Sequence, residues 1–504
     1  MLSLTKKQTE VLKIIEKQEH IFITGGAGVG KSFLIKHFIN NLPNGSYSVV
    51  APTGVAAIAI GGTTIHRFFG LSIAPAINQN DGHRDKIVEL LKGGLNTIII
   101  DEIGMVRSDT FQLIMLILAK SVSRANEDED IKIKMPKIIL VGDPFQLPPV
   151  ARDNDIEHIE MFINTRSPWF FDAPEYSNLN FKMLELTEIV RQKEDKKFAE
   201  ILNRIRLGSH TQSDIKIMNK CVSNNKKDDD GMVLAAINSD VNRINNNKLK
   251  LGKKGTKVKV YKAIVIDIDG KVNIKNFPIE EKLRLKKGAR VIVTSNKNDN
   301  EGNLIYTNGD MGTVTQLEDD IIFVSLDKGF MVEIERNEFE DIDYKAVTNK
   351  KGKKEVIAFA RGKVRQFPLK LGWAISIHKS QGATYDNAIL DLSNVFAEGQ
   401  AYVALSRLSS LGGLKLKTSI TMNTISTNQR VLEFFTKEKD KPKSPNPKNT
   451  KTKTKKIPTT SAERQRKFVE KQKQLGRNKI PLFMTREEEK IIKNTLKTLR
   501  QNSE

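Results

Sequence analysis

The sequence predicts an α/β protein with two lobes, each built on a doubly wound parallel sheet. The first observation is a repeated pattern in which short apolar segments run directly into polar turns, at residues 20–23, 48–50, 97–100 and 137–141. Uninterrupted apolar segments are typical of strands buried on both faces of a parallel sheet. The second observation is that helical patterns lie between these strands and return after residue 184. The third is the length of 504 residues, which exceeds what one core usually organises.

Changes in composition give the expected domain borders. Residues 1–180 form the first lobe, and residues 181–260 together with 366–436 form the second. Between the two parts of the second lobe, residues 261–365 change to short strands and turns. This pattern predicts a small β-barrel inserted into the second lobe.

The C-terminal part has a different character. Residues 437–456 carry no apolar side chain apart from prolines, so we expect a basic disordered linker over residues 437–457. Residues 458–504 are predicted to form a short, mainly helical accessory element. Its helical patterns lie at 461–475 and 486–499, and a strand-like segment lies at 480–484.

Charge and cysteine content limit the function classes. The net charge is +22. Residues 437–504 contain 21 Lys/Arg and 8 Asp/Glu, so the C-terminal part carries a net charge of +13. A basic balance favours a polyanionic partner, most often nucleic acid, although a lysine-rich tail can also serve only solubility. The single cysteine excludes an intramolecular disulfide and fits a reducing compartment. No segment is long and apolar enough to suggest a membrane span or a signal peptide.

A glycine-rich segment between the first predicted strand and the following helix matches the phosphate-loop pattern G-x-x-x-x-G-K-[ST]. Backbone N–H groups at the start of a helix bind phosphate oxygens, the lysine reaches the β- and γ-phosphates of a nucleotide, and the serine hydroxyl is a magnesium ligand. The residues expected to bind ATP here are Gly25, Gly26, Ala27, Gly28, Val29, Gly30, Lys31 and Ser32.

Two further strand ends carry groups suited to phosphoryl chemistry. Asp101 and Glu102 follow an apolar strand, and such a pair can divide its roles between binding magnesium and polarising the attacking water. The alternative is an acidic N-terminus of a helix. Gln146 lies in a proline-rich loop after the next strand, where its amide can contact a γ-phosphate. An ordinary proline-rich turn is the alternative for this loop.

Residues 366–386, QFPLKLGWAISIHKSQGATYD, combine a strand-like apolar segment at 371–377 with a polar turn. The turn HKSQG supplies phosphate-binding side chains and a glycine that permits close backbone approach. It lies far along the chain from the phosphate loop, so both serve one site only if two lobes meet. Arg191 and Arg407 are candidates for arginine fingers from the second lobe, although a lone arginine is more often a surface residue.

The combined motifs resemble those of superfamily-one DNA helicases of the Pif/RecD/Dda type, closest to the Pif family. The resemblance extends over roughly residues 4–435 and follows the order of the family. It is carried by GGAGVGKS, APTGVAAIAIGGTTIHRFFG, IIIDEIGMVRSD, ILVGDPFQLPPV, LTEIVRQ, FPLKLGWAISIHKSQGATYD and GQAYVALSRLSSLGGL.

The resemblance implies two RecA-like P-loop lobes and specific roles for individual residues. Gln8 matches the glutamine that reads the adenine edge, and Ser32 and Asp101 match magnesium ligands. Gln146, Arg191 and Arg407 match γ-phosphate contacts, and Gln381 matches a residue at the lobe interface, near the nucleotide and the DNA strand. The residues that match single-stranded DNA contacts are Thr53, His66, His378 and Lys379, to which we add Phe69 as a candidate base-stacking aromatic.

Other parts of the resemblance are less direct. Residues 71–84 are expected to supply a small wedge insertion that splits the duplex. Phe69 and Phe68 are open between a core and a DNA role, and lone histidines such as His66 and His378 are often ordinary loop residues. Two departures from the family pattern are Gly104, where a serine is usual, and Gly372, where an alanine is usual. Trp373 is interpreted as a core residue.

The resemblance therefore implies an ATP-dependent DNA helicase that uses ATP and Mg²⁺ and moves 5′ to 3′ on single-stranded DNA in replication, recombination or repair, within a family whose members include telomere-maintenance enzymes. Expected partners are single-stranded and forked DNA, with replication or single-strand-binding proteins as partners of the basic tail. We expect a monomer without membrane contact, in the cytoplasm or the nucleus. The alternatives are a DNA-stimulated translocase without unwinding and an ATP-switched DNA-binding module.

Overall fold

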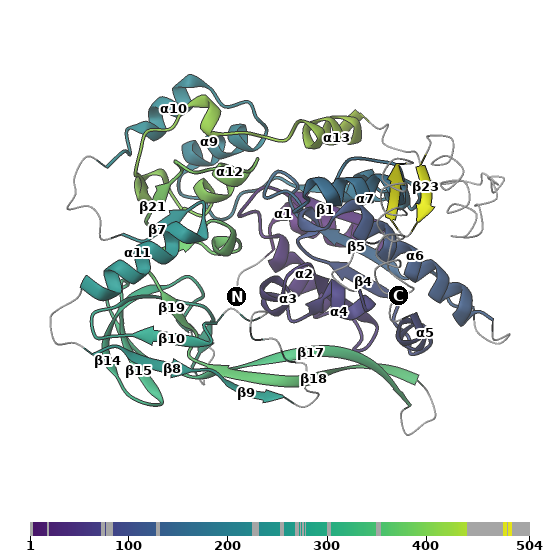
Figure 1. The fold of residues 1–504 in the computed structure, drawn as a ribbon, viewed down its shortest axis with the longest axis horizontal. Helices are drawn as coiled ribbons and strands as arrows, with labels where there is room; N and C mark the ends of the chain where they lie inside the picture. Colours follow the sequence, from purple (N-terminus) through teal and green to yellow (C-terminus); the bar gives the residue numbers. More distant parts are fainter. Residues whose placement is uncertain are drawn as a thin grey trace, which may run out of the picture. The chain divides into compact units, whose positions relative to one another are not determined.

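The computed structural model divides into two compact units, residues Met1–Lys439 and Asp440–Glu504. Figure 1 shows the fold. The structure describes residues 4–17, 20–71, 76, 84–127, 132–223, 231–251, 257–267, 272, 274, 277, 279–299, 304–348, 354–440, 477–480 and 482–485. Of the predicted wedge at 71–84, only Leu71, Ala76 and Arg84 belong to this part of the chain.

The first lobe contains a six-stranded parallel sheet with the order β3-β2-β4-β5-β1-β6. Its last strand lies beyond the expected border at residue 180. β6 pairs with β1 as an edge strand whose Leu186 enters the core beside Ile21 and Ile23, so the first lobe extends further than predicted. The strands are β1 (His20–Gly25), β2 (Tyr47–Ala51), β3 (Thr63–Thr64), β4 (Thr97–Ile100), β5 (Lys137–Val141) and β6 (Lys182–Leu186).

Helices cover both faces of this sheet, as the sequence predicted. Alternate residues of the strands enter different cores: Phe22, Ile98 and Leu140 enter one, and Ile23, Ile99 and Val141 enter the other. This alternation explains why the strands are apolar at every position. The helices are α1 (Lys6–Lys17), α2 (Lys31–Ile39), α3 (Gly54–Ala59), α4 (Ile65–Phe69), α5 (Arg84–Lys92), α6 (Ser108–Ala125), α7 (Asp153–Ile163) and α8 (Pro174–Asn178).

The second lobe contains a four-stranded parallel sheet with the order β20-β7-β21-β22. Its strands are short and lie in a core of their own. The elements are β7 (Val233–Ala235), β20 (Ala374–Ser376), β21 (Ala388–Asp391), β22 (Leu414–Leu416), α9 (Lys196–Arg206), α10 (Gln212–Asn219), α11 (Asn238–Leu251) and α12 (Gln400–Leu405).

The inserted region forms antiparallel strands around a separate core. A five-stranded sheet has the order β16-β15-β14-β11-β19, and two further pairs are β10-β8 and β12-β13. The strands are β8 (Lys259–Lys262), β10 (Lys282–Leu285), β11 (Arg290–Val293), β12 (Lys297–Asn298), β13 (Leu304–Tyr306), β14 (Met311–Leu317), β15 (Ile321–Leu326), β16 (Met331–Glu335) and β19 (Leu369–Leu371).

The apolar segment at 371–377 is not one strand, contrary to expectation. β19 pairs with β11 in the inserted region, whereas β20 pairs with β7 in the second lobe. The chain changes sheets at Gly372 and Trp373, and Trp373 packs in the core of the inserted region as a core residue. The inserted domain therefore extends past the predicted border at residue 365.

A long hairpin that the sequence patterns did not indicate also leaves the inserted region. β17 (Asn337–Thr348) and β18 (Lys354–Gln366) pair antiparallel, and β9 (Ile264–Asp267) adds a third strand. The hairpin passes along α5 and α4 of the first lobe (Figure 1).

The last helix of the first unit, α13 (Gln429–Asp440), belongs to the core of the first lobe and not to the second lobe as predicted. Its Phe434 ring stacks on Phe171 at 4.1 Å between ring centroids, and Arg430 forms an ion pair with Asp172. The physical reason is its apolar face, Val431, Phe434 and Phe435, which completes the aromatic cluster beside Phe22.

In the second unit, β23 (Arg477–Ile480) and β24 (Leu482–Thr485) pair antiparallel. The predicted strand-like segment is therefore part of a two-stranded hairpin. The predicted helices at 461–475 and 486–499, and most of the predicted linker, lie outside the described residues. Among the helices that are described, none is both long and apolar enough to cross a membrane.

Candidate functional site

The phosphate loop, residues 25–32, joins β1 to α2. Gly25 has φ +146°, and a Cβ there would lie 2.4 Å from the carbonyl oxygen of Leu186, so only glycine fits. The Lys31 ammonium donates to the carbonyl oxygens of Gly25 at 2.7 Å and Gly26 at 3.1 Å. Burial lowers the pKa of Lys31, while the nearby carboxylates oppose this shift. The lysine therefore lies folded over the loop to which the sequence assigns phosphate binding.

Asp101 and Glu102 follow β4 directly. Asp101 is 8% exposed, and burial, followed by the charge of Glu102, raises its pKa to about 7. Burial also raises the pKa of Glu102, against the opposing charge of Lys31. Glu102 has φ +50°, which is rare for a residue with a side chain and points to a functional constraint. Two desolvated carboxylates next to a lysine form a site that favours a cation.

Gln381 connects Glu102 to the Gln146 loop, residues 142–149. Its amide nitrogen donates to Glu102 Oε2 at 3.1 Å and to Gln146 Oε1 at 3.2 Å. Gln146 Nε2 in turn donates to Asp143 Oδ2 at 3.4 Å. Gln381 lies after β20 of the second lobe, whereas Glu102 and Gln146 follow strands of the first lobe. The structure thus brings together three of the predicted site residues across the two lobes.

Both predicted arginines lie at the same junction, where Arg407 is buried and Arg191 is half-buried. Arg191 Nη1 donates to the carbonyl oxygen of Ser406 at 2.8 Å, and the N–H of Arg191 donates to Gly28 of the phosphate loop at 3.1 Å. Arg407 donates to Val403 O and Ser406 Oγ, each at 3.0 Å. Burial lowers the pKa of both guanidinium groups. Within the described chain neither forms an ion pair with a carboxylate, so an anion placed between them is electrostatically favoured.

Gln8 lies 2% exposed on α1 beside the phosphate loop. Its Nε2 donates to Val29 O at 3.1 Å and to Gly30 O at 3.4 Å, and its Oε1 accepts from the N–H of Thr5. The amide therefore braces the loop in this structure, and adenine recognition remains a prediction. Ser32 is exposed at the start of α2.

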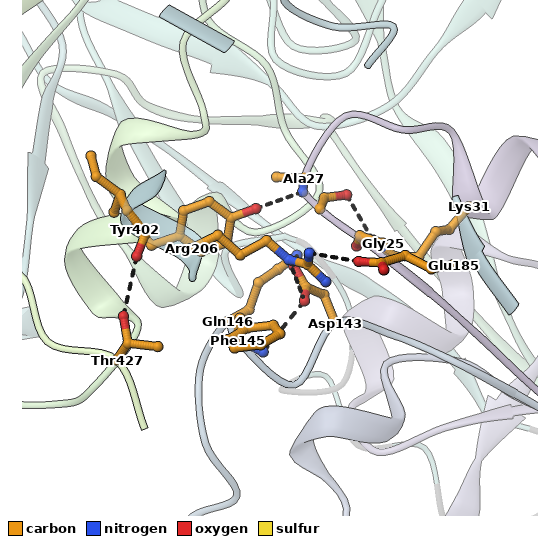
Figure 2. A network of polar contacts seen from close by, with 12 residues as sticks. Gly25, Ala27, Lys31, Asp143, Phe145, Gln146, Glu185, Arg206, Tyr402 and Thr427 are labelled. Atoms are coloured by element: carbon orange, nitrogen blue, oxygen red, sulfur yellow. Dashed lines mark hydrogen bonds and ion pairs between the residues drawn. The ribbon is translucent and has the colours of Figure 1, made fainter. Parts of the chain in front are cut away.

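Sequence reasoning missed two buried residues at this junction, which Figure 2 shows. Arg206, the last residue of α9, donates from Nε to Asp143 Oδ1 at 3.1 Å and from Nη1 to Glu185 Oε1 at 2.9 Å. The Tyr402 hydroxyl accepts from the N–H of Ala27 at 2.8 Å. Arg206 looks like an ordinary helix arginine in LNRIR, and its role depends on contacts that no local pattern encodes.

Gly399 was also missed, although it sets how closely the lobes approach. It precedes α12 with φ +73°, and a Cβ there would lie 2.2 Å from the carbonyl oxygen of Gln146 and 2.6 Å from that of Phe145. The second lobe therefore lies directly against the backbone of the Gln146 loop.

The residues expected to bind DNA differ in accessibility. In the first lobe, Thr53 caps α3 by accepting from the N–H of Ala56 at 3.2 Å. His66 is exposed at the surface. Desolvation of its ring by the surrounding protein, followed by the charge of Arg107, nevertheless lowers its pKa. Phe69 was wrongly assigned to base stacking. Its ring is fully buried in the core with Phe68, because α4 turns its apolar face toward the sheet.

In the second lobe, His378 and Lys379 are exposed on a short turn after β20. Phe396, which sequence reasoning missed, lies parallel to the His378 ring, with 6.2 Å between the ring centroids, and is 69% exposed. The N–H of Phe396 donates to Oε1 of the buried Gln400 at 3.1 Å, which fixes the loop that presents the ring. A phenylalanine in the polar stretch SNVFAEGQ was the signal that could have indicated this residue.

Comparisons with known proteins show which family the chain resembles. A family model described as PIF1-like helicase matches residues 3–216. The ATP-dependent DNA helicase Pif1 of Bdellovibrio bacteriovorus is 32% identical over 440 residues, which cover 86% of this chain and 92% of that protein.

Two crystal structures are similar as well. Bacteroides Pif1 in complex with ADP-AlF4 has a TM-score of 0.74 at 31% identity and matches 87% of this chain and 98% of its own. Bacteroides Pif1 bound to ssDNA has a TM-score of 0.59 at 31% identity and matches 87% of this chain and 97% of its own. The parallel sheets of both lobes are consistent with this RecA-like architecture. On this evidence, the chain belongs to the PIF1-like helicase family.

Proposed function

We propose that this protein is an ATP-dependent DNA helicase that moves 5′ to 3′ along single-stranded DNA and separates duplex. The observation that carries the proposal is the position of Gln381, whose amide is hydrogen-bonded to both Glu102 and Gln146. A residue of the second lobe is thereby in contact with the two first-lobe residues expected to act on the γ-phosphate. Family membership and similarity to an ATP-dependent DNA helicase support the assignment.

The nucleotide is expected to bind between the phosphate loop and the two arginines. Lys31 and the backbone of residues 25–32 hold the phosphates, and Gln8 holds the loop and the adenine edge. Glu102 orients and deprotonates the attacking water. Arg407 is buried and Arg191 half-buried, and neither has a carboxylate partner in the described chain, so both are suited to stabilise charge on the transferred phosphoryl group.

The donor set also fits Mg²⁺, which prefers hard oxygen ligands and needs few from the protein. Asp101 supplies a buried carboxylate at the end of β4, and Ser32 supplies a hydroxyl at the start of α2. When bound there, the ion would neutralise charge on the phosphates and help position them.

Hydrolysis is expected to be coupled to movement because the γ-phosphate contacts come from both lobes. Gln146, Gln381 and Arg407 are expected to hold the lobes together more tightly while the γ-phosphate bridges them. Phosphate release then lets them separate. If the DNA contacts of the two lobes alternate in strength, each cycle advances the strand.

We place the DNA strand along exposed groups of both lobes: Thr53 and His66 in the first, and His378, Lys379 and Phe396 in the second. A similar solved structure is described as Pif1 bound to ssDNA, which supports this choice of ligand. The exposed Phe396 ring offers a base-stacking face beside His378. The contacts are expected to tolerate any sequence and to weaken with salt.

Wider roles follow from the same assignment. We propose activity on forked DNA in replication, recombination or repair, in a monomer located in an intracellular, reducing compartment. The wedge at 71–84 and DNA or protein contacts by the basic C-terminal part remain predictions that lie largely outside the described residues.

The test compares ATP hydrolysis with and without single-stranded DNA and then unwinding of forked duplexes that carry only a 5′ or only a 3′ tail. We expect DNA-stimulated hydrolysis, unwinding from the 5′ tail, and loss of both in Lys31→Ala. Stimulated hydrolysis without unwinding would indicate a translocase, and nucleotide binding without stimulated turnover would indicate an ATP-switched binding module. Unwinding from the 3′ tail alone would contradict the polarity.

A further inference from the structure

Arg206 is a buried cation that contacts four parts of the molecule: the Gln146 loop, β6, the phosphate loop and α13. It is 4% exposed, and its guanidinium bridges Asp143 of the Gln146 loop and Glu185 of β6. Burial alone would lower its pKa, but Asp143, Tyr402 and Glu185 together outweigh burial and raise it, so the side chain stays charged. A buried, doubly paired arginine costs desolvation energy, and such groups often serve specificity or function.

The Arg206 side chain also touches the phosphate loop. A Cβ on Gly26 would lie 3.6 Å from Arg206 Cδ and 3.2 Å from the Tyr402 hydroxyl, which already accepts from Ala27 N–H. Two second-lobe side chains therefore pack on the backbone of residues 26–27. Arg206 Nη2 is buried and has no hydrogen-bond partner among the described residues, so one donor at this position is unused.

Asp143 is the link between Arg206 and Lys31. Lys31 donates to the carbonyl oxygen of Gly26, on which the Arg206 side chain also packs, and at this position the charge of Asp143 stabilises the Lys31 ammonium whereas that of Arg206 opposes it. Without Arg206, an uncompensated buried carboxylate would lie beside the lysine that must bind phosphate. Asp143 would then compete for Lys31 and repel the phosphates.

Arg206 also contacts the aromatic side of the Gln146 loop. Its guanidinium lies 4.6 Å from the Phe145 ring centroid and 5.7 Å from that of Phe435, and the two rings are 4.7 Å apart. Phe435 belongs to α13, which follows the second lobe and packs in the core of the first. The loop that carries Gln146 therefore packs, through Phe145, against both Arg206 and α13.

We propose that Arg206 is a positioning residue of the nucleotide site: it neutralises Asp143 so that Lys31 remains available to the phosphates, and it fixes the loop that carries Gln146. The inference rests on the proposed function, because it assigns Arg206 to the same ATP site. Two effects of Arg206 are separable: its charge governs nucleotide affinity, and its bridge between Asp143 and Glu185 governs turnover.

The test measures the dissociation constant of a fluorescent ADP analogue together with KM and kcat of DNA-stimulated hydrolysis. We expect Arg206→Gln to weaken nucleotide binding and raise KM by roughly tenfold or more, because it leaves a buried carboxylate unpaired. Arg206→Lys keeps the charge but cannot bridge both carboxylates, so KM should change little while kcat falls. Asp143→Asn combined with Arg206→Gln should recover nucleotide affinity but not kcat.

Arg204→Gln is the matched control. Arg204 lies two residues away on α9 and pairs with Asp214 of α10 at 2.6 Å. It should keep wild-type affinity and kcat. Wild-type affinity in Arg206→Gln, or a double variant that binds no better than Arg206→Gln, would overturn the inference. Lys31→Ala distinguishes the two failures: if it loses nucleotide binding while Arg206→Gln does not, the ATP site stands and only the role of Arg206 is wrong.

Discussion

Asp101 and Glu102 illustrate how a single site can combine strain with desolvation. Glu102 adopts a left-handed backbone conformation at φ +50°, which costs on the order of 1 kcal/mol or more for a residue with a side chain. Next to it, Asp101 is buried with few polar partners and has a raised pKa. Both features oppose folding and are expected where catalytic geometry is retained at the expense of stability.

The raised pKa of Asp101 predicts a pH-dependent stability difference. The folded protein holds a proton on Asp101 up to a pH of about 7, whereas the unfolded chain releases it near the ordinary value of 3.8. The contribution of Asp101 to the free energy of unfolding is therefore fully present below a pH of about 3.8 and is lost as the pH rises through about 7. Without nucleotide and metal, Asp101→Asn should raise Tm relative to wild type more at pH 8 than at pH 5.

Differential scanning fluorimetry across this pH range measures the effect. The exposed Glu157→Gln should show no pH-dependent difference. An equal Tm difference for Asp101→Asn at both pH values would contradict a proton linkage at Asp101.

Phe396 gives a second prediction for a single side chain. Phe396→Ala should weaken single-stranded DNA binding by about fivefold to a hundredfold, since one base–aromatic stack is worth ~1–3 kcal/mol. Phe396→Trp should retain binding. Fluorescence anisotropy with a labelled oligonucleotide measures this. Phe330→Ala is the control, because Phe330 is a similarly exposed phenylalanine in the inserted region. If His378→Ala and Lys379→Ala weaken binding but Phe396→Ala does not, only the stacking role fails.

Among the structural elements, the segment at 369–376 shows how one apolar run serves two sheets. β19 completes the sheet of the inserted region and β20 enters the second lobe, so the chain must pass close to β11 between them. Gly372 makes this possible: a Cβ there would lie 2.7 Å from the carbonyl carbon of Val291. The departure from the usual alanine thus has a packing reason in this chain.

Gly372→Ala is therefore expected to destabilise the protein. Alanine would gain ~0.4–1 kcal/mol by restricting the unfolded chain, but overpacking against backbone typically costs about 1–3 kcal/mol. The net effect should be a lower Tm by thermal unfolding. Gly412→Ala should be neutral, because its Cβ would meet only Ser410 Oγ at 3.8 Å. An unchanged Tm in Gly372→Ala would show that β11 can shift without cost.

For the whole molecule, the polar chain from Glu102 through Gln381 to Gln146 and Asp143 is the feature that joins the two lobes. It is a set of side chains with partners in both lobes, so its geometry depends on how the lobes meet. The close approach of Gly399 to the Gln146 loop fixes the same junction through backbone contact.

Gln381→Ala should uncouple the lobes without emptying the nucleotide site. We expect DNA-stimulated kcat to fall by about a hundredfold, as for loss of one preorganised donor, while KM for ATP stays nearly unchanged because the phosphate loop is intact. Steady-state kinetics with saturating oligonucleotide test this. The exposed Gln316→Ala is the control. A large increase in KM with unchanged kcat would instead place Gln381 in ground-state nucleotide binding.

Local patterns were sufficient for the α/β class, the two lobes and the phosphate loop, because each strand and each glycine-rich turn is encoded by neighbouring residues. Motifs also singled out the carboxylates and arginines as candidates, and the structure places these side chains at one junction. Phe69 was misassigned because a single strip of sequence does not show which face of α4 is buried. Arg206 and Tyr402 were not found, since each acts through residues more than twenty positions away.

Borders between domains were the weakest expectation for the same reason. β6 and α13 carry ordinary strand and helix patterns, and nothing in those patterns says which sheet or core they join. Chemistry that depends on side-chain type and short spacing, such as the phosphate loop and the Asp101–Glu102 pair, can be read along the chain. The pairing of β6, the return of α13 and the Arg206–Asp143 contact arise from burial and long-range packing, so they became visible when the folded chain brought distant residues together.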